Sequence, residues 1–110
     1  MATRTLALVQ GTLDLLVLGS LASSPMHGYG IATRVRDRTG GELHIEDAAL
    51  YQALHRLDRQ SLVEAEWAPS ENGRRARYYT LTAAGRKRLR EETTQWRRYS
   101  RAVEAVLQGV

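Results

Sequence analysis

Residues 46 to 81 read EDAALYQALHRLDRQSLVEAEWAPSENGRRARYYTL, and this stretch decides the fold. Four apolar side chains recur in its first part at the i, i+3, i+4, i+7 spacing of one helix face: Leu50, Ala53, Leu54 and Leu57. That spacing predicts a short amphipathic helix. Two strand-like runs follow directly, joined by a turn with a basic tip. A helix of this size followed by a β-hairpin is typical of a winged helix, a layout that usually binds DNA and seldom catalyses a reaction.

The two runs after this helix have the pattern of a hairpin. In the first run Val63, Ala65 and Trp67 alternate with two glutamates, which predicts a strand with one buried side. Residues 77–81 read as the return strand. The turn between them contains Asn72-Gly73, a pair expected to supply the positive φ angles that a tight hairpin needs.

The composition excludes several classes of protein. The chain has 110 residues, enough for one domain, and its 43% hydrophobic content is ordinary for a globular protein. It has no cysteine, which excludes disulfides and thiolate metal sites, and its three histidines lack metal-ligand spacing. No apolar run approaches the roughly 20 residues of a membrane span, and the N-terminus lacks the apolar stretch of a signal peptide. We therefore expect a cytoplasmic protein with no metal, no cofactor and no enzymatic activity.

Basic charge is concentrated in one part of the chain. The net charge is +4, yet residues 74–101 hold ten basic and only two acidic side chains. They comprise the tip of the predicted hairpin and the segment that follows it. A patch of this kind attracts phosphate backbones. Fifteen of the sixteen cations are arginine, the better bidentate partner for phosphate and guanine.

The N-terminal segment predicts a buried helix. Residues 6–21 are apolar on nearly every side, so a helix there needs cover from two directions. In so small a chain we expect a second subunit to supply part of that cover. Ser23-Ser24-Pro25 ends the helix, because proline disfavours helical geometry in the residue before it.

A second helix and two short features fill the segment before residue 50. The helix is expected to begin near His27 and to end before Gly40-Gly41, since glycine readily takes the left-handed conformation at a helix end. Leu43 and Ile45 alternate with polar residues and predict a very short strand. Asp47 is the expected N-cap of the next helix.

The C-terminal segment predicts a long helix that protrudes from the domain. Thr82 is expected to cap a helix of roughly 28 residues, about 42 Å long. Apolar residues recur every seven positions along it: Leu89, Trp96, Val103 and Val110. Such a repeat is typical of a dimer seam. The sequence therefore divides into a winged helix-turn-helix domain at 1–81 and a dimerisation helix at 82–110.

Five short motifs follow one another along the chain: GTLD at 11–14, HGYGI at 27–31, LYxALxRL at 50–57, GRRARYY at 73–79 and LTxxG at 81–85. Each motif is weak alone. Together and in this order they make the chain resemble the PadR family of bacterial transcriptional regulators over nearly its whole length. The single long C-terminal helix resembles the short subfamily of that family.

The resemblance implies a homodimer of winged helices, held together by the C-terminal helices and the first helix. It implies repression through a roughly palindromic double-stranded DNA operator. It also implies that a small-molecule effector, in some relatives a planar hydrophobic compound, binds at the dimer interface and changes the operator affinity. One position departs from the family pattern: many members have proline where this chain has Gln52, so the operator sequence cannot be carried over from relatives.

The predicted DNA contacts lie on the outer face of the 50–57 helix, just beyond it, and at the hairpin tip: Tyr51, Gln52, His55, Arg56, Arg59, Arg74, Arg75 and Arg77. Amide, imidazole and guanidinium groups can read base edges or bind phosphates. The plainer alternative is a solvated polar surface, on which Tyr51 packs its ring and His55 bonds within the protein.

The predicted dimer interface is apolar and doubles as the candidate effector pocket: Leu13, Leu16, Leu89, Trp96, Tyr99, Val103 and Val106. Trp96 has two interpretations. It either fills the seam as a core aromatic or pairs with its symmetry mate to form the walls of a flat ligand slot.

The sequence thus predicts a mainly α fold with a small β-hairpin, a winged helix-turn-helix plus a long C-terminal helix. It predicts a sequence-specific homodimeric repressor that an effector releases from its operator. The alternative is a winged-helix protein-interaction module, whose basic patch docks an acidic partner. A third interpretation is a small-molecule-binding protein without DNA binding.

Overall fold

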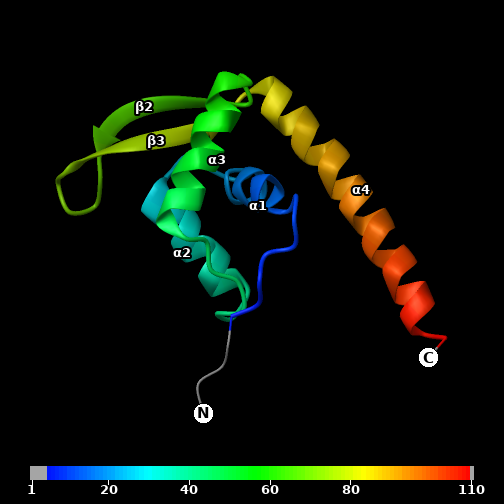
Figure 1. Ribbon diagram of the computed structural model, residues 1–110. Coiled ribbons are helices and arrows are strands. Elements are labelled where there is room, and N and C mark those ends of the chain that lie inside the picture. The colour runs from blue at the N-terminus through cyan, green and yellow to red at the C-terminus, as the bar shows by residue number, and fades with distance from the viewer. Residues whose placement is uncertain (1–4, 110) are drawn as a thin grey trace, which may run out of the picture.

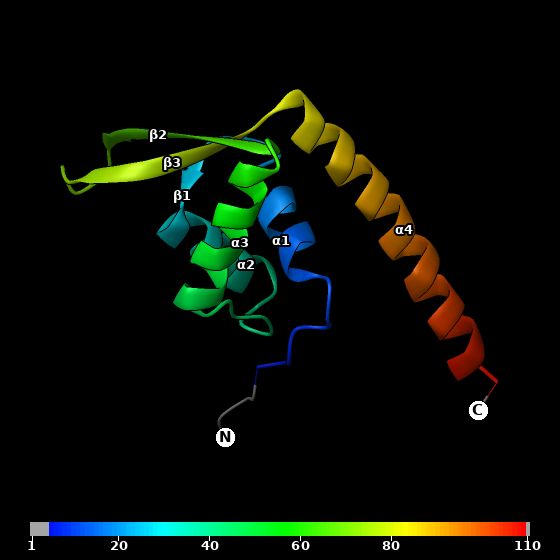
Figure 2. The same ribbon diagram turned by 45° about the horizontal axis from the view of Figure 1, so that its top comes forward.

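The computed structural model describes residues 5–109, and its elements follow in the order α1 (Leu13–Ser20), β1 (Met26–His27), α2 (Gly28–Arg38), α3 (Asp47–Arg59), β2 (Val63–Pro69), β3 (Arg75–Leu81) and α4 (Ala83–Leu107). The helices α1, α2 and α3 cluster together, the β2–β3 hairpin projects to one side, and α4 runs away on the other (Figures 1 and 2). The predicted fold class is confirmed. None of the helices in this described part of the chain is long and apolar enough to cross a membrane.

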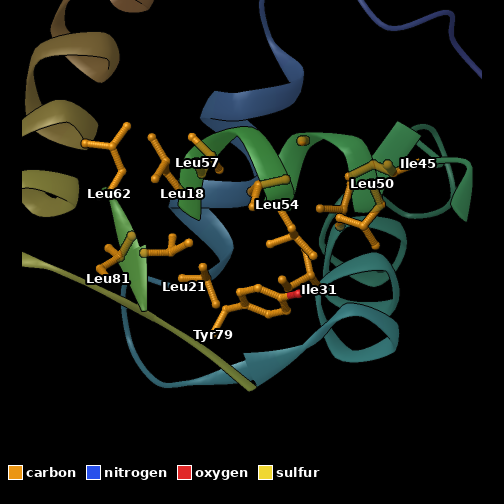
Figure 3. Close-up of a cluster of buried hydrophobic side chains, with 14 residues drawn as sticks. Leu18, Leu21, Ile31, Ile45, Leu50, Leu54, Leu57, Leu62, Tyr79 and Leu81 are labelled. Atoms are coloured by element: carbon orange, nitrogen blue, oxygen red, sulfur yellow. The ribbon is translucent and has the colours of Figure 1, made fainter. Parts of the chain in front are cut away.

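The core lies where α1, α2 and α3 meet the base of the hairpin. Its buried apolar side chains come from all of these elements (Figure 3): Val17, Leu18, Leu21, Ile31, Val35, Ile45, Leu50, Ala53, Leu54, Leu57, Leu62, Val63, Tyr79 and Leu81. The predicted inner face of α3 is confirmed, because all four of its apolar residues belong to this cluster. Their burial fixes the rotation of α3, so its opposite face is turned to solvent.

The sheet has three antiparallel strands in the order β1-β3-β2. Val63 pairs with Leu81 at the base of the hairpin, and Trp67 pairs with Arg77 further out. The prediction that Trp67 lies on the buried side of its strand is wrong, since this side chain is 54% exposed. The hairpin extends past the edge of the core, so only its base has a protein layer to cover it.

The third strand is β1, which pairs Met26 with Tyr79 and His27 with Tyr78. The short strand predicted at Leu43 and Ile45 is therefore wrong. Residues 43–46 form no strand, and Ile45 is instead fully buried in the core. The chain reaches the free edge of β3 immediately before α2 begins, and β1 occupies that edge.

Helix α1 is shorter than the sequence predicts. The apolar pattern begins at residue 6, whereas the helix begins at Leu13. Gly11 takes a φ of 88°, and the backbone N–H of Thr12 donates to the carbonyl of Val9 at 3.0 Å. A turn thus replaces the expected first turns of the helix, since glycine adopts a positive φ without the steric cost that other residues meet.

Polar side chains cap α2 and α4. Nδ1 of His27 accepts a hydrogen bond from the backbone N–H three residues on, at 2.9 Å. Oγ1 of Thr82 does the same for α4 at 3.0 Å, which confirms the predicted cap. The predicted cap at Asp47 is wrong, because α3 begins with Asp47 itself and Glu46 precedes it without a side-chain hydrogen bond. Asp47 still supports α3 with a negative charge in its first turn.

Helix α4 has 25 residues and protrudes from the domain. Among them only Gly85 is buried, and Leu89 packs partly buried against the core. The radius of gyration, 15.4 Å, exceeds the roughly 13 Å of a compact chain of this length. The last position of the predicted seven-residue repeat, Val110, lies outside the described residues.

A close contact fixes where α4 starts. A Cβ atom on Gly85 would lie 2.0 Å from the carbonyl oxygen of Leu62. The same oxygen accepts the backbone N–H of Thr82 at 3.1 Å, and Oγ1 of Thr82 donates to the carbonyl of Ser61 at 2.7 Å. The first turn of α4 is thereby held against the loop between α3 and β2, with no room for a side chain at residue 85.

Replacing Gly85 with alanine should lower the free energy of unfolding by about 1–3 kcal/mol, the usual range for an overpacked site. The added methyl group has no space beside the Leu62 carbonyl. Thermal unfolding followed by circular dichroism, at one fixed protein concentration, measures the loss. Gly19→Ala in α1 is the matched control, because a Cβ there meets nothing within 4 Å. Equal midpoints for the two variants would contradict the close contact.

Candidate nucleic-acid interface

The solvent face of α3 carries four of the predicted DNA contacts. Tyr51, Gln52, His55 and Arg59 are exposed there. They line a surface groove whose other wall includes Arg77 of β3. An amide, an imidazole and two guanidinium groups therefore face the same region of solvent, and these are the groups that bind base edges and phosphates.

Arg56 has a different environment from the other predicted contacts. Its Nη2 lies 2.5 Å from Oδ1 of Asp14 in α1, and both side chains are partly buried. This ion pair ties α3 to α1 on the flank of the helix. A role for Arg56 in DNA contact stays a prediction, and its guanidinium already has a carboxylate partner within the chain.

Tyr51 lies over the start of α2. A Cβ on Gly28 would come within 3.1 Å of its hydroxyl oxygen and 3.2 Å of its Cζ, so the ring rests against backbone that carries no side chain. Tyr51 is nevertheless 57% exposed. Its ring is thus supported from below while its outer surface stays open, which suits an aromatic side chain that contacts a ligand.

The tip of the hairpin is a tight turn at residues 70–74. Gly73 has a φ of 81°, while Asn72 does not have a positive φ, so the expectation that both residues supply positive angles is wrong. Asn72 stabilises the turn through its side chain instead, since its Oδ1 accepts the backbone N–H of Arg74 at 3.1 Å. The side chain of Arg74 is exposed at the end of the turn.

His27 connects the start of α2 with the hairpin tip. Its Nδ1 accepts the backbone N–H of Gly30, so in the neutral ring the proton lies on Nε2, which faces Oε2 of Glu71 at 3.4 Å. A hydrogen bond from its own backbone, followed by this contact with His27, lowers the pKa of Glu71 below its ordinary value. No pattern in the sequence indicates this pairing, because the two residues are brought together only by the docking of β1 on β3.

The hairpin face nearest α3 carries an aromatic ring between two arginines. The Cζ atoms of Arg75 and Arg77 lie 5.5 Å and 5.8 Å from the ring centroid of Trp67, within the range of cation–π interactions. Nη2 of Arg77 also lies 4.0 Å from Oδ2 of Asp58 in α3. Trp67 and Asp58 were not predicted as functional residues, although the hairpin register that follows from a short turn would have placed Trp67 opposite Arg77.

A groove of about 570 Å³ separates the hairpin from the starts of α2 and α3. Its lining combines exposed aromatic rings with the three arginines of the hairpin: Tyr29, Tyr51, Trp67, Arg74, Arg75 and Arg77. The structure therefore brings together the predicted contacts of α3 and those of the hairpin. Basic side chains interleaved with aromatic rings are well suited to a nucleic-acid backbone.

The residues predicted for the dimer interface fall into two sets. Leu13, Leu16 and Leu89 are partly buried against the core at the junction of α1 and α4. The others lie on the protruding part of α4 and are exposed, from 39% to 74%: Trp96, Tyr99, Val103 and Val106. Nothing within the described part of the chain covers this second set, which is an apolar stripe along one side of the helix.

Glu92 is a half-buried carboxyl between α1 and α4. Its Oε2 has no hydrogen-bond partner among the described residues. Burial raises the pKa of Glu92 above its ordinary value of 4.5, while the charge of Arg88 opposes that rise and the charge of Asp14 adds to it. Glu92 lines a groove with Trp96 and Tyr99, so an unsatisfied acceptor lies beside the apolar stripe.

Residues 5–109 contain no group of three or more histidine, aspartate or glutamate side chains arranged to hold a metal ion.

Comparison with known proteins places the chain among transcriptional regulators. Residues 17–91 match the family described as the transcriptional regulator PadR-like family. A PadR family transcription regulator from Clostridium difficile is similar in structure, with 28% identity and a TM-score of 0.77 over 88% of this chain and 99% of that one. A PadR family regulator from Eggerthella lenta has 33% identity and a TM-score of 0.75, over 89% of this chain and 83% of that one.

A further solved structure is similar in fold alone. It is PadR from Bacillus subtilis in complex with operator DNA, with 20% identity and a TM-score of 0.68 over 77% of this chain and 48% of that one.

Replacing Glu92 with glutamine should raise the thermal unfolding midpoint at neutral pH, by a modest amount because the group is only half-buried. A carboxyl whose pKa is raised by folding stabilises the fold while it is protonated, and that stability is lost as the pH rises through the raised pKa. The difference in unfolding midpoint between variant and wild type should therefore disappear below about pH 4. Glu91→Gln is the matched control, because Glu91 is exposed. A difference that persists unchanged at acid pH would contradict this account of Glu92.

Proposed function

Because the chain belongs to the PadR-like family of transcriptional regulators, we propose that it is a sequence-specific DNA-binding repressor. In this proposal it acts as a homodimer on a palindromic double-stranded DNA operator, and a small-molecule effector releases it. The family consists of regulators, so the chain is not an enzyme. The observation that carries the proposal is a pair of adjacent grooves, one along the polar face of α3 and one along the arginines of the hairpin, which share Tyr51 and Arg77.

The proposed DNA contacts follow from where these side chains lie. Helix α3 enters the major groove with Gln52 and His55 toward the base edges. Arg74, Arg75 and Arg77 lie on the hairpin beside it and bind the flanking phosphates. Tyr51 lies between the two sets, since it lines both grooves beside α3.

The proposed dimer is supported by the exposed apolar stripe on α4. A two-fold symmetric pair of such helices would bury Trp96, Tyr99, Val103 and Val106 against their equivalents. In this arrangement residues 82–110 serve as a dimerisation helix and residues 1–81 as the DNA-binding domain. Two copies of α3 related by a two-fold axis read the two halves of a palindrome.

The proposed effector site lies where α1 meets α4. Trp96 lines two grooves there, one of about 360 Å³ with Val9, Glu92 and Tyr99 and one of about 590 Å³ with Leu16 and Leu89. Both fall in the size range of small-molecule sites. A planar compound stacked on Trp96 would change the packing between the two subunits and so the separation of the two α3 helices.

Fluorescence anisotropy on the DNA upstream of the protein's own gene, at two salt concentrations, tests the central proposal. A scrambled duplex of equal length is the reference. We expect a preference of roughly a thousandfold for the specific duplex. Arg74→Ala/Arg75→Ala should weaken binding to both duplexes and lower the slope of log K against log salt by about two, because each phosphate contact releases roughly one counterion.

The matched control is Arg98→Ala/Arg101→Ala, which removes the same charge from exposed positions in the second half of α4, the helix that runs away from the hairpin (Figure 1). It should leave the salt slope nearly unchanged. Equal binding to the specific and scrambled duplexes would contradict sequence specificity at this site. Absence of binding to either duplex would favour the protein-interaction module.

Val103→Arg should convert the dimer to a monomer and weaken operator binding by at least about tenfold. The substitution places a charge in the apolar stripe, where burial without a partner is costly. Sedimentation velocity gives the oligomeric state, and the same anisotropy assay gives the affinity. Ala105→Arg makes the same kind of change on the opposite face of α4, at a position that is also exposed. Dimers of equal strength in both variants would exclude the stripe as the interface.

A further inference from the structure

We propose that Trp67 is a positioning residue of the DNA interface, whose indole ring holds the guanidinium groups of Arg75 and Arg77 in place for phosphate binding. This inference rests on the proposed function and deepens it. It assigns a role to a side chain outside α3 that carries no charge of its own. Three observations lead to it, namely the register of the hairpin, the exposure of the ring, and the position of Asp58.

The register places the three side chains on one face of the hairpin. Trp67 of β2 is directly opposite Arg77 of β3, and Arg75 lies two residues before Arg77 on β3, nearer the hairpin tip. Cross-strand partners point to the same side, and a long or aromatic side chain also reaches the diagonal position. Nearer the base, this face carries Val63, which is buried in the core. Trp67 therefore continues the inner face of the hairpin to where no core lies beneath it.

The exposure of Trp67 has no explanation in the packing of the domain. The side chain is 54% exposed and does not belong to the buried core. The Cζ atoms of Arg75 and Arg77 lie over its ring, at 5.5 Å and 5.8 Å from the ring centroid. An exposed tryptophan with arginines over its face is the geometry of cation–π stacking. Stacking uses the face of a guanidinium and leaves its N–H edge available for a phosphate.

Asp58 is a competing partner for Arg77, and in this proposal the indole ring keeps Arg77 away from it. Its Oδ2 lies 4.0 Å from Nη2 of Arg77, longer than a charge-assisted hydrogen bond of about 2.8 Å. Both side chains are about two-fifths exposed. Without the ring, Arg77 can close on this carboxylate and lose part of its attraction for phosphate. Trp67 thus maintains an arginine in a conformation that is ready to bind, which reduces the ordering cost of association.

A double-mutant cycle tests whether Trp67 acts through the arginines. Trp67→Leu should weaken binding to specific and scrambled duplexes alike by about three- to tenfold, the range expected for one or two cation–π contacts. Trp67→Phe, which keeps an aromatic face, should stay within about twofold of wild type. In an Arg75→Ala/Arg77→Ala background, Trp67→Leu should change the affinity by less than about twofold, because the side chains that it positions are gone.

Asp58→Asn tests whether the carboxylate of Asp58 competes for Arg77, an effect on DNA affinity that a purely structural role of Trp67 would not produce. Combined with Trp67→Leu, it should restore much of the lost affinity, because the competing carboxylate is removed. Full additivity of Trp67→Leu with the arginine replacements would overturn the proposal, since the ring would then act on DNA or on the fold directly. Failure of Trp67→Phe to retain affinity would overturn it as well.

A measurement without DNA separates this inference from the proposed function. In the free protein, stacking should shift the side-chain Nε–H proton signals of Arg75 and Arg77 upfield through the indole ring current. The shift should be smaller in Trp67→Phe, and absent in Trp67→Leu if that variant folds. Unshifted signals in the wild type overturn the proposal even if the protein binds its operator. Shifted signals in a protein that binds no duplex overturn the proposed function, and with it the role of Trp67 in DNA binding.

Discussion

The close approach of Gly85 to the carbonyl oxygen of Leu62 is the constraint on which the shape of the molecule depends. The hairpin begins immediately after this carbonyl, and α4 begins immediately after the return strand, so one backbone contact sets the angle between them. The polar face of α3 and the apolar stripe of α4 are consequently held in a fixed relation, although they lie far apart along the chain. In the proposed dimer, this contact links the packing of the two α4 helices to the separation of the two α3 helices. A residue without a side chain is thus required where the two proposed interfaces join.

The arginines of the chain differ in whether their guanidinium groups have partners within the protein. Arg56 pairs with Asp14, Arg77 lies near Asp58, and Nη1 of Arg86 donates to the carbonyl of Ala22 at 3.3 Å. Arg56 and Arg86 hold elements of the fold together as well as adding positive potential, whereas Arg77 lies beside a carboxylate without closing on it. Arg74 extends from the turn with no such partner among the described residues. In the proposed DNA complex, long-range attraction draws on the whole basic region, whereas close contact depends on which guanidinium groups are held away from internal carboxylates.

The sequence predicts those parts of the structure that are determined by periodicity and local turn chemistry. The inner face of α3, the hairpin and the Thr82 cap all follow from the spacing of neighbouring residues. Prediction from the sequence fails where contacts between distant segments determine the structure. The strand β1 exists because Met26 and His27 meet β3, and no pattern in two residues could indicate it. Trp67 fits the alternation of a buried strand, yet the hairpin is longer than the core beneath it. The outer face of α3 follows from the same helical spacing as its inner face. The contacts that position the hairpin side chains beside it, such as those of Trp67 with Arg75 and Arg77, do not follow from that spacing.

The strand order β1-β3-β2 has a consequence for how the chain is made. Synthesis releases the N-terminal segments first, so β1 emerges well before β3, the strand with which it pairs. During that interval the nascent helices α1, α2 and α3 lack Tyr79 and Leu81, which complete the core. The apolar surface that these two side chains later cover stays open to solvent, and such surface is where nascent chains associate. The domain can therefore close only after residue 81 has been synthesised, and the hairpin that is proposed to bind DNA is also the part that covers this apolar surface.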